Sequence, residues 1–113
     1  MRLVVQKVSQ SSVKIEGEIV GAIDKGYMVL VGITNGDDEL LVEKMVDKLV
    51  NLRIFEDEND KLNLSLLDVG GSVLSISQFT LYANCKKGRR PSFIDAAKPD
   101  ISSPLYDLSL IHI

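Results

Sequence analysis

Three neighbouring polar residues, Ser77, Gln78 and Thr80, stand in a largely apolar stretch and are well placed for chemistry. Residues 73–82 are rich in β-branched and aromatic types, a composition typical of a strand. Alternation puts Gln78 and Thr80 on one face with apolar neighbours, and Ser77 on the other with Phe79. We therefore predict a strand covered on both faces, where an unpaired polar group costs roughly 1–3 kcal/mol. The group is either an internal hydrogen-bond network or a ligand site.

Most catalytic chemistries lack the partner residues that they would need here. With one histidine and one cysteine, the chain offers no cluster of zinc ligands, and we expect neither a metal nor a cofactor. The scattered glycines match no phosphate-binding or dinucleotide-binding fingerprint. A nucleophilic Ser77 or Thr80 would need a base, and a pair of Cys85 with His112 is the formal thiol alternative. Hydrolysis would therefore depend on backbone donors and on groups of the substrate.

Positive charge gathers in residues 86–90, the basic loop, which holds four cations in an acidic chain. Such loops suit phosphate contacts, although many are simply solvated. Lys7, in a predicted strand of residues 3–8, shares a face with apolar side chains. Its ammonium either reaches solvent past a packed stem or points into a pocket. Lys7, Arg89 and Arg90 are therefore candidate contacts for an anion.

A set of strands and one long helix must position these side chains. Apolar and alternating runs predict strands at residues 3–8, 27–33, 52–55 and 61–64, and a hairpin over residues 13–20 that turns at Gly17. The wholly apolar run 27–33 is typical of a central strand buried on both faces. Apolar residues at helical spacing after a capping aspartate predict one amphipathic helix at about residues 38–51.

Length and composition indicate one globular domain. With 113 residues, the chain can form one core, and 45% hydrophobic and 26% charged residues are ordinary proportions. Because the net charge is −3, any role in binding nucleic acid depends on a local patch. A lone cysteine, a start without a secretory signal and the lack of a long apolar run favour the cytoplasm.

The sequence Ser-Gln-Phe-Thr-Leu at residues 77–81 resembles the signature of the D-aminoacyl-tRNA deacylases, also called D-tyrosyl-tRNA deacylases. Other stretches resemble that family in the same order, namely residues 1–8, 26–32, 51–57, 61–63 and 87–93. The resemblance covers nearly all of residues 1–107. One five-residue motif alone would be weak, whereas this many motifs in register make the resemblance specific.

The resemblance implies a small α/β fold with curved, mostly antiparallel, barrel-like β-sheets, working as a homodimer with active sites at the interface. It also implies a cytoplasmic hydrolase without metal. The substrate would be the ester between a D-amino acid, or mischarged glycine, and the 3′-terminal adenosine of tRNA. Cleavage of this ester is an editing step in translation that keeps wrong-handed residues out of proteins.

Carried over by residue, Ser77, Gln78 and Thr80 are the catalytic candidates, and Phe79 lines the same pocket for the aminoacyl-adenosine. Thr80 is either the nucleophile or a residue that positions the ester. In the second case, backbone amides and the 2′-hydroxyl of the RNA carry the chemistry, and the lack of a base in the sequence favours this case.

The remaining substrate-binding candidates are Lys7, Arg89 and Arg90. The family commonly has arginine where this chain has Lys7, and lysine keeps the charge but loses the planar fork. The C-terminal end departs further, because family members continue with a helix, strands and an Asn-x-Gly-Pro motif that projects into the partner's site and excludes L-amino acids. Nothing in this chain matches that motif.

We therefore expect a single domain over residues 1–113 that lacks the C-terminal part of the family. Ser103 and Pro104 form a helix-start signal, whereas residues 108–113 do not resemble the family's helix and are interpreted as an atypical tail. Two alternatives to the enzyme remain open. One is a non-catalytic tRNA-binding domain whose basic loop holds phosphates, and the other is an inactive truncated fragment.

Overall fold

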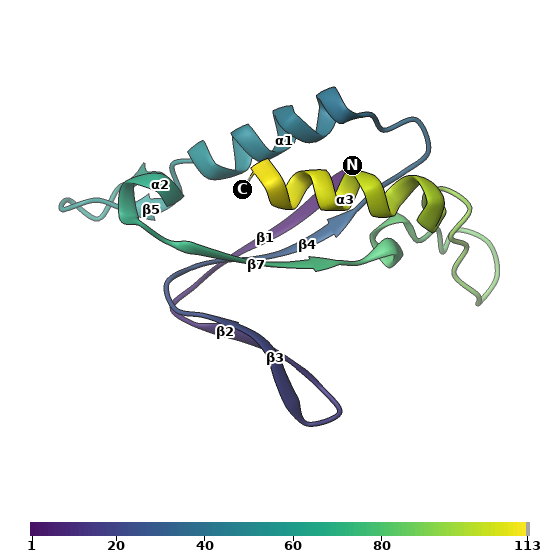
Figure 1. Ribbon diagram of the computed structural model, residues 1–113, viewed down its shortest axis with the longest axis horizontal. Helices are drawn as coiled ribbons and strands as arrows, with labels where there is room; N and C mark the ends of the chain where they lie inside the picture. Colours follow the sequence, from purple (N-terminus) through teal and green to yellow (C-terminus); the bar gives the residue numbers. More distant parts are fainter. Residues whose placement is uncertain (113) are drawn as a thin grey trace.

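A three-stranded sheet forms the centre of the protein, seen here in a computed structural model that describes the backbone of residues 1–112 and the side chains of residues 1–110. Its strand order is β1 (Arg2–Val8), β4 (Gly26–Gly32) and β7 (Ser72–Ser77). β1 runs antiparallel to β4, whereas β7 runs parallel to it. Two helices, α1 (Glu39–Asn51) and α3 (Pro99–His112), pack against each other on one side of this sheet (Figure 1).

β4 is the central strand because almost all of its residues are apolar. Tyr27, Val29 and Val31 alternate along it and are each at most 3% exposed, which confirms the predicted central strand. Gly26 allows β7 to approach β4 closely, since a Cβ atom at this position would lie 1.8 Å from the Ser72 carbonyl oxygen. The parallel pairing of β4 with β7 therefore requires glycine at this position.

The predicted amphipathic helix is confirmed as α1. Its N-cap is Asp38, whose carboxylate accepts a hydrogen bond of 2.8 Å from the Leu41 N–H. Val42, Val46 and Leu49 are its buried residues, so the apolar stripe faces inward as its spacing predicts.

Two smaller hairpins accompany the sheet. β2 (Ser11–Ile15) and β3 (Glu18–Ile23) form the predicted hairpin, with φ of 51° at Glu16 and 84° at Gly17, and it projects away from the sheet and helices (Figure 1). β5 (Phe55–Glu56) and β6 (Leu62–Leu64) form the other, so the strand predicted at residues 52–55 is confined to its last residue and the next. The small α/β class is confirmed, but the described strands form three separate sheets and close no barrel.

The long strand predicted at residues 73–82 is wrong in its second half. β7 ends at Ser77, and Phe79–Tyr82 form a short 3₁₀ helix, η1. The last sheet bond runs 2.8 Å from the Gln78 N–H to the Val31 carbonyl, one residue before β4 itself ends. With no partner strand beyond that point, the chain satisfies its backbone groups locally through i→i+3 bonds.

The C-terminal region also differs from expectation. Helix α3 begins at Pro99 rather than at Ser103, and it contains Pro104. The helix continues through residues 108–112, which we interpreted as a tail unlike the family's helix, and residue 113 lies outside the described residues. A short helix that we did not predict, α2 (Leu66–Val69), begins at a capping box of Ser65 and Asp68. No helix in the described part of the chain is long and apolar enough to cross a membrane.

Candidate active site

The catalytic candidates lie together where β7 passes into η1, in a stretch that we call the 77–80 segment. Ser77 ends the strand and is exposed, whereas Gln78 and Thr80 are half-buried. The Gln78 side-chain amide donates a hydrogen bond to the Thr80 hydroxyl oxygen. The polar residues of the segment therefore share an internal hydrogen bond, one of the two arrangements that we predicted. They also lie next to exposed surface, which a ligand could reach.

Phe79 connects the 77–80 segment to the chain beyond the basic loop. Its ring is 58% exposed and meets Phe93 edge to face, with centroids 5.3 Å apart and planes at 72°. Asn84 and Ser92 exchange backbone hydrogen bonds of 2.7 and 2.8 Å, which close the intervening loop. We did not predict the Phe79–Phe93 contact, because the two rings are fourteen positions apart and only the folded loop joins them.

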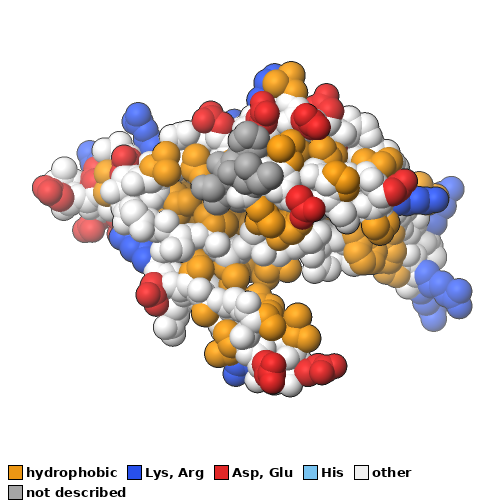
Figure 2. All heavy atoms as spheres, viewed as in Figure 1, with side chains coloured by type: hydrophobic (Ala, Val, Ile, Leu, Met, Phe, Trp, Pro, Cys, Tyr) orange, Lys and Arg blue, Asp and Glu red, His pale blue; other side chains and the backbone are white. Residues whose placement is uncertain are grey.

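The basic loop therefore begins a few residues after η1. Arg89 and Arg90 are exposed, and Gly88, at φ 69°, forms the turn before them. Figure 2 shows Lys and Arg side chains gathered at the end of the molecule where Figure 1 places the loop after η1. The structure thus brings Arg89 and Arg90 near the same end of the sheet as the 77–80 segment, on a surface that favours an anion.

Lys7 lies at the opposite end of the sheet. It pairs with Tyr27, which pairs with Val73, whereas Ser77 pairs with Val31. Lys7 is therefore four strand residues, or about 13 Å, from the level of Ser77 at roughly 3.3 Å per residue. The structure does not bring Lys7 to the 77–80 segment of its own chain.

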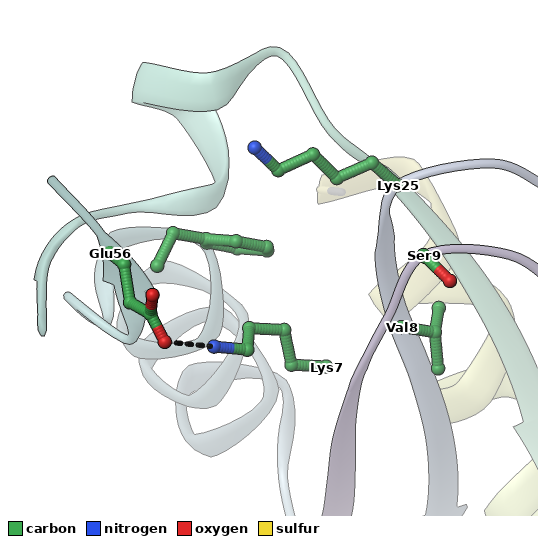
Figure 3. A pocket seen from close by; sticks show the side chains of 6 residues that line it. Lys7, Val8, Ser9, Lys25 and Glu56 are labelled. Atoms are coloured by element: carbon green, nitrogen blue, oxygen red, sulfur yellow. Dashed lines mark ion pairs between the residues drawn. The ribbon is translucent and has the colours of Figure 1, made fainter. Parts of the chain in front are cut away.

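The side chain of Lys7 instead lines a separate hollow of about 360 Å³. Its ammonium is 3.9 Å from a Glu56 carboxylate oxygen and 6.0 Å from the centre of the Phe55 ring. Lys25 points into the same hollow, with its ammonium 5.6 Å from that ring (Figure 3). Because the Lys7–Glu56 pair is largely exposed, it contributes little to stability.

Acid–base chemistry has little support around Thr80. The side chain of His112, the only histidine in the sequence, lies outside the described residues, and Cys85 is an exposed free thiol. Burial, together with Asp37, raises the pKa of the Tyr82 phenol against the lowering effect of Arg2, so this group of η1 stays protonated at neutral pH. Among the described residues, no three His, Cys, Asp or Glu side chains group as a metal would require.

The small α/β domain is that of a family of hydrolases that act on ester bonds. A family model described as D-Tyr-tRNA(Tyr) deacylase matches residues 4–112, and the chain belongs to this family, which confirms the resemblance. It is 64% identical over 107 residues to the D-aminoacyl-tRNA deacylase of Bacillus pumilus, covering 95% of this chain and 73% of the relative. It is 56% identical to the D-aminoacyl-tRNA deacylase of Thermus aquaticus, covering 95% of this chain and 70% of the relative.

Two solved structures share the fold of this chain. One, described as c-Myc DNA Unwinding Element Binding Protein, has a TM-score of 0.91 and 39% identity, covering 98% of this chain and 74% of its own. A second, described as a probable eukaryotic D-amino acid tRNA deacylase, has a TM-score of 0.81 at 20% identity, covering 97% of this chain and 64% of its own. The second likeness shows a shared fold.

Proposed function

We propose that this chain hydrolyses the ester between a D-amino acid, or mischarged glycine, and the 3′-terminal adenosine of tRNA. The observation that carries the proposal is the match to the deacylase family over residues 4–112, which includes the 77–80 segment. A non-catalytic tRNA-binding domain is disfavoured, because relatives up to 64% identical are named deacylases.

Thr80 positions the ester in this proposal and does not attack it. Its oxygen accepts a hydrogen bond from the Gln78 amide, and an amide cannot take up the proton that a nucleophilic hydroxyl must lose. The accepted bond also draws on an oxygen lone pair, which makes that oxygen a poorer nucleophile. The hydroxyl proton remains available to donate to the substrate.

Water is then the nucleophile. It adds to the ester carbonyl, and backbone N–H groups of the site stabilise the oxyanion that forms. The bond from the carbonyl carbon to the 3′-oxygen breaks, and the proton that the attacking water loses passes through the neighbouring 2′-hydroxyl of the RNA to the leaving 3′-oxygen. Ser77 and Gln78 complete the polar lining around the carbonyl, and no metal or cofactor takes part in this scheme.

Recognition of the tRNA acceptor end is assigned to Phe79 and the basic loop. An exposed aromatic face suits stacking with adenine, which is worth roughly 1–3 kcal/mol per base. Arg89 and Arg90, exposed beyond η1, are suited to the phosphates of the preceding nucleotides.

The proposed working state is a homodimer in the cytoplasm, where tRNA is charged. Support comes from apolar side chains on the surface of the projecting hairpin, with Ile15, Ile19 and Val20 each about 60% exposed (Figure 2). In such a dimer, Lys7 contacts substrate only if a partner brings its own site to the other end of this sheet. Light scattering at micromolar concentration tests the proposal, and a monomer at every concentration would contradict it.

The test of activity is release of D-tyrosine from D-tyrosyl-tRNA, with L-tyrosyl-tRNA measured beside it. The Bacillus pumilus relative is the positive control, and a version of this chain extended to the length of that relative is the third sample. We expect hydrolysis of the D-ester and its loss on a substrate with a 2′-deoxy terminal adenosine. If the extended version leaves the D-ester intact while the relative cleaves it, the proposed activity is wrong.

A further inference from the structure

Helix η1 rests on the paired ends of β1 and β4. Arg2 is directly opposite Gly32 in the antiparallel register of these two strands. Both residues contact η1, although they are thirty positions apart in the chain. We call this pair the η1 seat.

The Arg2 guanidinium holds η1 in two ways at once. Its Nη1 donates a hydrogen bond of 2.7 Å to the Leu81 carbonyl oxygen. Its central carbon also lies 4.5 Å from the centre of the Tyr82 ring, within the range of a cation–π contact. A planar guanidinium can stack and donate together, whereas the compact ammonium of lysine is suited to one role at a time.

Gly32 supplies the space that this arrangement needs. A Cβ atom there would lie 2.9 Å from the Leu81 Cβ and 3.3 Å from the Gln78 carbonyl oxygen. Because Cβ is fixed to the backbone, the clash with Leu81 can be relieved only by moving η1. The Gln78 N–H bond to the Val31 carbonyl then fixes the start of the turn, while Arg2 fixes its end.

We propose that Arg2 is a positioning residue, which sets the orientation of Gln78 and Thr80 by holding the end of η1 on the sheet. The proposal rests on the proposed deacylase function for its catalytic consequence. Arg2 reaches the reacting ester only through η1 and lies outside the residues that we assign to substrate contact. Its loss should therefore loosen η1 locally and slow the chemical step more than it weakens substrate binding.

The first test is amide hydrogen exchange in the chain itself, which needs no enzymatic activity. The reporters are the Leu81 and Ala83 N–H groups, which bond to the Gln78 and Thr80 carbonyls at 3.3 and 3.2 Å. In Arg2→Met we expect exchange at these two amides to accelerate roughly tenfold to hundredfold, the range for losing a hydrogen bond to a charged group. Amides of the β1–β4 pairing should keep their protection.

The second test separates kcat from KM on D-tyrosyl-tRNA in the extended version of the chain. We expect Arg2→Met to lower kcat at least tenfold with less than a threefold change in KM, and Arg2→Lys to restore part of the loss. Arg53→Met is the matched control, since Arg53 is exposed and distant in sequence from the seat, and it should change neither measurement.

The outcomes are distinct. If exchange at Leu81 and Ala83 is unchanged in Arg2→Met, or if β1–β4 amides accelerate equally, Arg2 has no specific hold on η1 and the proposal fails. If hydrogen exchange accelerates locally but KM rises by as large a factor as kcat falls, the positioning role is contradicted. If the extended version without substitution shows no deacylation while the Bacillus pumilus relative does, the proposed function fails, and the exchange result still decides whether Arg2 holds the turn.

Discussion

Replacement of Tyr27 by phenylalanine should stabilise the protein, which is unusual for a fully buried residue. The Tyr27 side chain is 0% exposed, and its hydroxyl has no hydrogen-bond partner among the described residues. An unsatisfied buried hydroxyl costs about 1–3 kcal/mol. Its ring stacks on Phe55 with centroids 5.3 Å apart, and phenylalanine keeps that contact. After a small penalty for the void left by the oxygen, we expect a gain of about 1 kcal/mol.

The matched control is the same chemical change at Tyr106 in α3. The Tyr106 hydroxyl lies 3.1 Å from the Ser75 hydroxyl and donates to the Ser75 carbonyl at 3.1 Å. Tyr106→Phe removes these bonds and should destabilise the protein by about 1 kcal/mol. Two Tyr→Phe substitutions with opposite signs separate the effect of an unpaired hydroxyl from any general effect of losing one.

Urea denaturation followed by circular dichroism measures both changes, with the midpoint expected to move while the slope m stays constant. For a domain of this size, 1 kcal/mol corresponds to a melting-temperature shift of about 4 °C. A Tyr27→Phe variant that is destabilised as much as Tyr106→Phe would refute the argument, since it would show that the Tyr27 hydroxyl is paired.

The same substitution should alter stability in alkali. Burial raises the pKa of Tyr27 above its usual value of 10.0. A group with a raised folded-state pKa contributes stability that is complete below pH 10 and is lost as the pH rises through the folded value. Tyr27→Phe should therefore lose less stability than the parent between pH 9 and 12, as followed by urea midpoints. Equal pH dependence in both proteins would contradict the buried, neutral phenol.

Three further predictions concern the site and one helix cap. Thr80→Val should lower kcat for D-tyrosyl-tRNA by about tenfold, the worth of one hydrogen bond, and a loss beyond a ten-thousandfold would instead indicate a nucleophile. Replacing both Arg89 and Arg90 by glutamine should make the slope of log affinity against log salt shallower by about 1.4, measured by titration with uncharged tRNA at several salt concentrations. The kcat of this variant on D-tyrosyl-tRNA should be unchanged. Backbone and side-chain hydrogen bonds from Ser65 lower the pKa of Asp68, so its contribution to stability is present above pH 3.8 and is lost as the pH falls through the folded value. Urea midpoints of Asp68→Asn and the parent should differ at pH 7 and converge near pH 2.

The parts of the fold that could be predicted are those whose signals are local. The spacing of Val42, Val46 and Leu49 and the cap at Asp38 define α1 within thirteen residues of sequence. The apolar run of β4 and the turn at Gly17 are equally local. Each of these elements depends on the periodicity of apolar residues or on the backbone preference of one residue. Both signals are visible in the sequence without knowledge of the tertiary structure.

The parts that could not be predicted depend on partners that are distant in the sequence. The position of Lys7 follows from the β1–β4 register, which fixes the end of the sheet at which its ammonium lies. The start of α3 is a second case, because prolines at 99 and 104 both suit the first turn of a helix. The Tyr106 hydroxyl in α3 bonds to Ser75 in β7, so the position of this helix depends on a strand that is distant in the sequence.

The change from strand to 3₁₀ turn decides how the candidate site works. In a strand, Gln78 and Thr80 would share a face with their Cα atoms about 6.6 Å apart, at roughly 3.3 Å per residue. In η1 the chain coils, and the Gln78 amide reaches the Thr80 hydroxyl. Their bond forms at the start of η1, and the contacts that hold η1 on the sheet come from Val31, Gly32 and Arg2 on other strands. The local motif supplies the chemical groups, but the ends of β1 and β4 set their geometry, so substitutions in those strands should affect the site without touching it.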